Sequence, residues 1–194
     1  MKQVHTIDTE SLDPRLLEQA ELLRASHLFV HPIEGALMCE KQHIFLALAG
    51  LKPLSEATSG HWIETPTGHR SVPDEPAEVA SFLASLGLTY LISQDEWATH
   101  ATESLAPDLI REYQTPNRDE QLVGRLFGYP RTAVDAFPEG CMSVKEQEAL
   151  EQQEPLLAGC LVSFRFSRDH WQEEMKVVTE WATVLRAYGL DQTE

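Results

Sequence analysis

One stretch, Asn117–Phe137, constrains the fold of this chain more than any other. It reads Asn-Arg-Asp-Glu-Gln-Leu-Val-Gly-Arg-Leu-Phe-Gly-Tyr-Pro-Arg-Thr-Ala-Val-Asp-Ala-Phe. Its first four residues resemble a helix-capping signal, because Asn accepts hydrogen bonds from a helix start and Glu follows three positions later. Gly128 favours the left-handed conformation that ends a helix, and Pro130 fits the first position of the next one. The stretch therefore predicts two helices joined by a tight corner at Gly128-Tyr129-Pro130.

The same kinds of signal predict helices along the rest of the chain. Each predicted helix begins at an Asp, Ser or Pro that suits a helix start, or ends at a glycine that suits a helix stop. The predicted helices begin at Asp13-Pro14, span about Glu34 to Ala49 before Gly50, span about Pro76 to Leu86, begin at Ser93-x-x-Glu96, span Pro107 to Tyr113, begin at Ser143-x-x-Glu146, and run from an Asp169 cap to Gly189.

Strand signals are fewer. Leu88–Ser93 is apolar and β-prone, and Ala158–Phe166 alternates between apolar and polar residues. Residues 61–72 are either a hairpin around Thr65-Pro66-Thr67-Gly68 or a plain surface loop. We therefore predict a helix-dominated α+β fold with a small sheet of two to four strands. Residues 1–10 are predicted to form a flexible N-terminus, and residues 11–190 a single domain.

Composition limits the partners of such a domain. The 194 residues carry a formal net charge of -16, which opposes binding to nucleic acid or to anionic membranes. No apolar run reaches the length of a membrane-spanning helix, and the N-terminus lacks the apolar region of a secretory signal. The three widely spaced cysteines match neither a disulfide framework nor a metal knuckle. We expect a cytoplasmic protein with no nucleic-acid or membrane partner and no cofactor.

The corner at Gly128-Tyr129-Pro130 is the leading candidate site. Arg125 and Arg131 flank it, and backbone N–H groups at the start of the second helix favour an anion. Arg125, Tyr129 and Arg131 are thus the predicted ligand-binding residues for a small anion. The alternative is a structural corner whose arginines form salt bridges in solvent. Both interpretations fit the sequence.

The residues of the corner also resemble a sequence signature found in other proteins. Gly-Arg-Leu-Phe-Gly-Tyr-Pro, followed by Ala133, Val134 and Phe137, resembles a signature of small prokaryotic proteins of unknown function, in which a Gly-Tyr-Pro turn precedes a short helix ending in Phe. Cysteines often follow the proline in those proteins, where this chain has Thr132 and Ala133. This departure from the pattern removes any thiol role at these positions, and the resemblance supplies no activity.

Other candidates are weaker. His27 and His31, and likewise Cys39 and His43, are four residues apart, a spacing that can place two metal ligands on one helix face. Pro32 interrupts the first pair and no zinc motif accompanies either, so no metal site is predicted. Cys141 lies in a Gly-Cys-Met loop as a minor thiol candidate. Arg165, Arg168 and His170 gather where the last predicted strand meets the last helix, which is a common ligand position.

Three functions remain open from the sequence. The first is a binding or structural module for a small anionic metabolite at the corner. The second is an enzyme on such a ligand, in which Arg125 and Arg131 hold charge and Tyr129 or a histidine moves protons. The third is a homo-oligomer formed through the apolar stripe of the last helix, made of Trp171, Met175, Val178, Ala182 and Leu185.

Overall fold

Eight helices account for most of the regular structure in the part of the chain that the computed structural model describes, which is residues 12–29, 39–58, 60–66, 68–92, 97–102, 106–113, 115–116, 118–153 and 164–191. Helix dominance is therefore confirmed for these residues. The helices are α1 (Pro14–Ala25), α2 (Cys39–Leu48), α3 (Pro76–Ser85), α4 (Ala106–Tyr113), α5 (Glu120–Leu126), α6 (Arg131–Ala136), α7 (Val144–Glu151) and α8 (Trp171–Ala187). The N-terminus predicted to be flexible lies outside the described residues.

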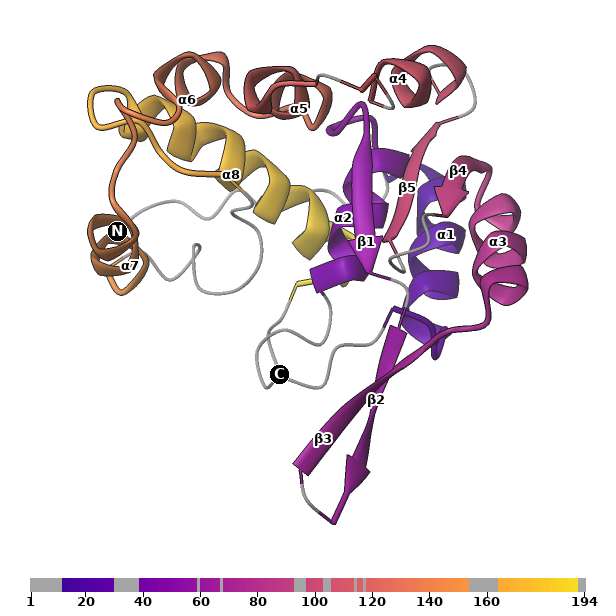
Figure 1. Cartoon of the computed structure of the whole chain (residues 1–194). Helices are drawn as coiled ribbons and strands as arrows, with labels where there is room; N and C mark the ends of the chain where they lie inside the picture. Colours follow the sequence, from indigo (N-terminus) through magenta and orange to yellow (C-terminus); the bar gives the residue numbers. More distant parts are fainter. Residues whose placement is uncertain are drawn as a thin grey trace.

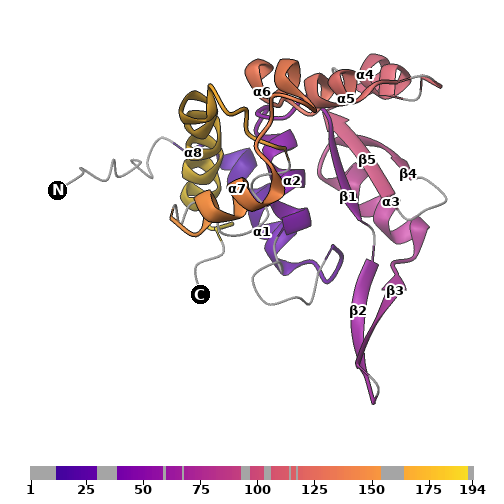
Figure 2. The ribbon, with the colours of Figure 1, turned by 60° about the vertical axis from the view of Figure 1, so that its left-hand side comes forward.

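The strands form two small antiparallel sheets. One has the order β1-β5-β4, from β1 (Ser55–Thr58), β5 (Trp97–Thr102) and β4 (Leu88–Ile92). The other is a hairpin of β2 (Gly60–Thr65) and β3 (Gly68–Pro73), with Gly60 opposite Pro73, so residues 61–72 form the predicted hairpin rather than a plain loop. The hairpin projects from the body of the molecule, whereas α2 packs against β1 and β5, and α3 packs against β4 (Figures 1 and 2).

Helix α8 supplies much of the hydrophobic core. Its side chains at Val178, Trp181 and Leu185 are buried and join a cluster with residues of α1, α2 and α3. Complete burial of an apolar side chain of this size contributes roughly 1.5–3 kcal/mol, so this face holds α8 in place. The apolar stripe predicted for the last helix is confirmed as a core face. Among the described residues, no helix is both long and apolar enough to cross a membrane.

The predicted helical corner is present. Helix α5 ends at Leu126, Gly128 has a φ of 71°, and α6 begins at Arg131. A Cβ on Gly128 would lie 2.9 Å from Pro53 Cδ and 3.1 Å from the Leu51 carbonyl oxygen, so glycine is required by close approach as well as by conformation. The corner is thus fixed against the segment that connects α2 to β1. Figure 1 shows α4, α5 and α6 following one another in a row along one side of the molecule.

Helix starts differ from prediction in three places. Asp119 caps α5 by accepting a hydrogen bond from Leu122 N at 2.6 Å, whereas the predicted capping residue Asn117 lies outside the described residues. Pro130 occupies the cap position of α6 instead of its first helical position. His170 occupies the cap position of α8, so the prediction of an Asp169 cap is wrong. The Ser143–Glu146 capping box at α7 is confirmed.

One predicted helix is wrong. The signal Ser93-x-x-Glu96 predicts a helix, but the chain from Trp97 onward is strand β5. Strand β5 is the central strand of its sheet, with hydrogen-bonded neighbours on both sides, and this pairing overrides a local capping signal. Of the predicted strand at 158–166, only Phe164, Arg165 and Phe166 are described. They lie outside any strand, although Phe164 and Phe166 are buried and Arg165 is exposed, as the alternation predicts.

Candidate functional site

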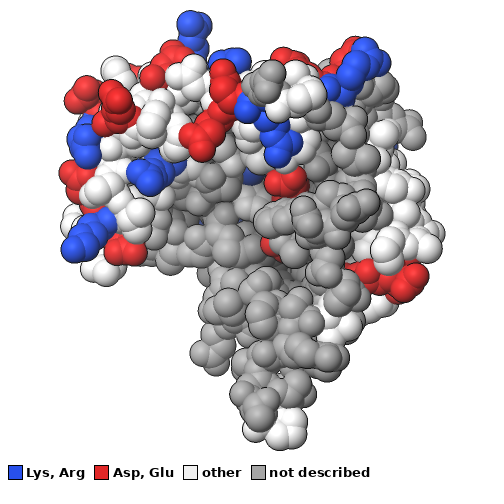
Figure 3. All heavy atoms as spheres, viewed as in Figure 1, with Lys and Arg blue, Asp and Glu red and all other residues white. Residues whose placement is uncertain are grey.

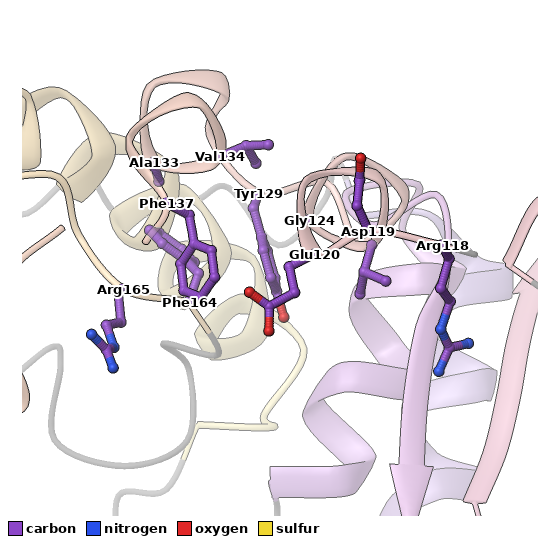
Figure 4. A pocket seen from close by; sticks show the side chains of 11 residues that line it. Arg118, Asp119, Glu120, Gly124, Tyr129, Ala133, Val134, Phe137, Phe164 and Arg165 are labelled. Atoms are coloured by element: carbon purple, nitrogen blue, oxygen red, sulfur yellow. The ribbon is translucent and has the colours of Figure 1, made fainter. Parts of the chain in front are cut away.

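A cavity of about 640 Å³ lies beside the helical corner. Its apolar wall comes from α5, from α6 and from the segment before α8, and its two arginines, Arg118 and Arg165, lie at opposite ends (Figure 4). The lining residues are Arg118, Asp119, Glu120, Val123, Gly124, Tyr129, Ala133, Val134, Phe137, Phe164 and Arg165. A cavity of this size, with a mainly apolar wall and a few polar groups, is typical of a small-molecule site.

Arg118 is held in position at one end of the cavity. Its guanidinium lies 3.8 Å from the centre of the Tyr113 ring, and its Nη1 donates a hydrogen bond to the Tyr113 carbonyl oxygen at 3.1 Å. Tyr113 is itself fixed, because its hydroxyl donates to Glu56 Oε1 at 2.6 Å. Burial, together with this bond to Glu56, raises the pKa of Tyr113 to about 12. These contacts restrict the otherwise exposed side chain of Arg118, so it has less freedom to lose when a ligand binds.

Arg165 lies at the other end, with Tyr129 and Glu120 between the two arginines (Figure 4). The Arg165 side chain is exposed, while Phe164 and Phe166 on either side of it are buried. Its backbone is also fixed, because Met142 N donates to the Phe166 carbonyl oxygen at 2.8 Å. The two buried phenylalanines thus fix the backbone from which the exposed Arg165 side chain extends at the edge of the cavity.

Tyr129 forms part of the cavity wall and belongs to a chain of aromatic rings. Its ring centre lies 5.8 Å from that of Phe127 and 5.2 Å from that of Phe164. Phe164 in turn lies 6.3 Å from Trp181 in an edge-to-face arrangement. The wall of the cavity is therefore continuous with the hydrophobic core.

Lys52 lies behind this wall. Its side chain is only 3% exposed, and its Nζ lies 5.6 Å from the centre of the Tyr129 ring and 4.8 Å from that of Trp181. The same Nζ is 2.9 Å from Nδ1 of His43. Burial lowers the pKa of Lys52 to about 7, against an opposing effect of the nearby carboxylate of Glu40. A large fraction of this amine is therefore uncharged near neutral pH.

The residues predicted from the sequence divide between cavity and surface. Tyr129 lines the cavity, as does Arg165 from the weaker group that precedes the last helix. Arg125 and Arg131 are exposed and are not lining residues. The Arg131 side chain is 91% exposed and pairs with Asp135 at 3.3 Å. The basic side chains that the structure brings to the cavity are those of Arg118 and Arg165, and the carboxylates of Asp119 and Glu120 line it as well.

The metal and thiol candidates have other contacts. His27 Nε2 lies 3.1 Å from Glu78 Oε1, and His43 contacts Lys52. His31 and the Cys39 side chain lie outside the described residues. Within those residues, no group of three or more His, Cys, Asp or Glu side chains is arranged to hold a metal ion. Cys141 is buried, which raises the pKa of its thiol, so it is a poor nucleophile.

Acidic and basic side chains are interspersed on the described surface around α5 and α6 (Figure 3). No family model, curated protein or solved structure matches the chain.

Sequence reasoning missed Arg118, Glu120 and Lys52 as site residues. Arg118 carries no local signal, because it is positioned by a ring from the preceding helix. Burial of Lys52 depends on contacts with Tyr129 and Trp181, which are distant in the sequence. For Glu120 the available sequence signal is its position as the first residue of α5, directly after the capping residue Asp119.

Proposed function

We propose that the protein binds a small ligand with an anionic group and a flat apolar body in the cavity beside the corner. The observation that carries this proposal is the cavity itself, in which an aromatic wall lies between two arginines. Tyr129 and Phe164 suit a flat ring or chain, and Arg165 and Arg118 suit a carboxylate or phosphate. Glu120 faces any hydrogen-bond donor on the same ligand.

We further propose that the described elements belong to one α+β domain and that the protein works in the cytoplasm. One hydrophobic cluster joins residues of α1, α2, α3, α6 and α8, which supports a single domain. The buried, unpaired thiol of Cys141 is compatible with a reducing compartment.

Thermal stabilisation tests the binding proposal, using benzoate and phenyl phosphate as probes. Acetate and inorganic phosphate are the matched anions without a ring. The ring-bearing anions should raise the melting temperature by mass action, and the ring-free anions should raise it less. Replacement of both arginines, Arg118→Ala with Arg165→Ala, should weaken binding of benzoate by about tenfold to a hundredfold, because each charged hydrogen bond contributes roughly 1.5 kcal/mol.

The surface arginines provide the control. Arg125→Ala with Arg131→Ala should leave the affinity for benzoate unchanged, since neither side chain lines the cavity. A loss of binding in this pair, with the cavity pair unaffected, would move the site to the outer face of the corner. Absence of stabilisation by all four probes contradicts the proposal.

A further inference from the structure

The buried Lys52 and the partly buried His43 form a pair that the proposed binding site does not use. The Nζ–Nδ1 distance of 2.9 Å allows direct proton transfer between the two side chains. Trp181 and Tyr129 enclose the amine, so water is largely kept away from it. A lysine amine that is desolvated in an apolar pocket is a stronger nucleophile at neutral pH than an exposed one.

Tyr129 is the side chain that the cavity and the pair share. Tyr129 lines the cavity, and the Lys52 amine lies 5.6 Å from the centre of the same ring. Tyr129 follows Gly128 at the corner and is only partly buried. A change of its side-chain rotamer, without refolding of the core, is therefore the smallest movement that would bring ligand and amine together.

We propose that Lys52 captures the carbonyl group of an aldehyde or ketone ligand as an imine, with His43 as the proton acceptor. This inference rests on the proposed function, because the ligand enters through the same cavity with its anionic group on Arg165 or Arg118. A rotamer change of Tyr129 gives the ligand in the cavity access to the amine.

The chemistry balances without a further reactant. The neutral amine attacks the carbonyl carbon, the π electrons of the C=O bond move to oxygen, and His43 takes a proton from the nitrogen. The oxygen then takes this proton from His43, which gives a neutral carbinolamine and restores the imidazole. Loss of the second N–H proton and of hydroxide, which combine as water, leaves the C=N bond. One amine and one carbonyl compound thus give one imine and one water.

Other lysines of the chain serve as internal controls. Lys41 is as buried as Lys52, but its Nζ donates to the Ser26 carbonyl oxygen at 2.6 Å and does not adjoin the cavity wall. Lys145 and Lys176 are exposed. At pH 7 about half of a lysine with a pKa of about 7 is neutral, against roughly 0.04% of an exposed lysine.

Reductive trapping tests the proposal. The full-length protein is incubated at neutral pH with 4-carboxybenzaldehyde and sodium cyanoborohydride, and the reduced adduct is located by mass spectrometry. Among the lysines we expect the adduct to form first on Lys52, with labelling of Lys41, Lys145 and Lys176 at least about tenfold slower. Any adduct on the terminal α-amine, which is also partly neutral at this pH, is assigned separately in the mass spectrum. Lys52→Met should abolish the adduct, Lys41→Met should retain it, and His43→Gln should slow its formation.

The role of Tyr129 in controlling access to Lys52 is tested separately. Tyr129→Ala should speed trapping at Lys52, because the ring no longer blocks the path, whereas Tyr129→Phe should trap at the wild-type rate. Labelling that is spread over the exposed lysines, or that is unchanged in Lys52→Met, overturns the proposal. Circular dichroism and thermal unfolding confirm that each variant is folded.

A second probe separates this proposal from the proposed function. 4-(Hydroxymethyl)benzoate has the same shape and charge but no carbonyl to capture. If it stabilises both the wild type and Lys52→Met while the aldehyde gives no adduct on Lys52, the binding site stands and the imine is refuted. If the alcohol does not bind and the aldehyde gives no adduct, the proposed function and this inference fall together.

Discussion

The amine of Lys52 lies in an environment that normally excludes a charged lysine. Two aromatic rings and an imidazole surround it, and its exposed fraction is 3%. The rings stabilise the ammonium form through their π faces, but burial outweighs this and lowers the pKa to about 7. The side chain therefore makes the stability of the fold depend on pH.

Replacement of Lys52 by methionine should remove this dependence. In the unfolded chain the lysine keeps its proton up to about pH 10.5, whereas the folded chain releases it near pH 7. Between these values the unfolded state binds more protons, so the free energy of unfolding rises with pH, by at most about 1.4 kcal/mol per pH unit. Lys52→Met should lack this rise.

Urea unfolding from about pH 6 to about pH 9.5 measures the effect. The exposed lysine of Lys176→Met serves as the control and should leave the slope of the wild type unchanged. Parallel curves for wild type and Lys52→Met would show that the two states bind protons at Lys52 equally.

At the scale of the element, the corner between α5 and α6 depends on one glycine. Gly128 combines a φ of 71° with a close approach to Pro53 and to the Leu51 carbonyl oxygen. The chain offers a matched comparison, because Gly50 has a φ of 73° and nothing within 4 Å of the position of a Cβ. The pair separates conformational strain from steric contact.

Gly128→Ala should therefore destabilise the protein more than Gly50→Ala. Both variants carry the left-handed strain of about 1 kcal/mol, but only the first adds a contact that something must relieve. We expect a loss of about 1 kcal/mol at Gly50 and about 2–4 kcal/mol at Gly128, measured by urea unfolding. Equal losses would mean that the segment at Leu51–Pro53 yields freely.

Local signals in the sequence predict the corner itself, but they do not predict features that depend on partners elsewhere in the chain. Gly128 permits the left-handed backbone that ends a helix and Pro130 restricts its own φ, so the corner can be predicted from two residues. The position of Arg118 depends on the ring of Tyr113 and cannot be predicted from its own neighbours. Strand β5 shows the converse, because the capping signal at Ser93-x-x-Glu96 is valid locally but is overridden by partners on both sides of the strand.

At the scale of the whole molecule, Glu174 joins parts of the chain that are far apart in sequence. Its carboxylate is 1% exposed and accepts hydrogen bonds from Thr132 Oγ1 at 2.7 Å, from Ser167 N at 2.8 Å and from Ser167 Oγ at 2.6 Å. These bonds hold α8 and the segment before it against α6. The sequence pattern of α8 does not predict a buried carboxylate, since Glu174 resembles its exposed neighbour Glu173.

Glu174→Ala should lower the free energy of unfolding by about 3 kcal/mol, because it leaves a buried N–H and hydroxyls without their acceptor. Glu173→Ala is the control and should change stability by less than about 0.5 kcal/mol. Chemical denaturation of both variants gives the comparison. A loss below about 1 kcal/mol at Glu174 would show that water replaces the carboxylate at little cost.

Aromatic contacts connect the cavity wall to Trp181, so the fluorescence of Trp181 can report on changes at the cavity and at Lys52. An indole buried away from water emits at shorter wavelength than an exposed one, and the ammonium of Lys52 lies 4.8 Å from this ring. A positive charge so close shifts the energy of the excited indole, so proton loss at Lys52 should move the emission of Trp181. Occupation of the cavity reaches the same fluorophore through Tyr129 and Phe164. Because the chain has four tryptophans, the signal of Trp181 in a titration is the difference between the wild type and Trp181→Phe.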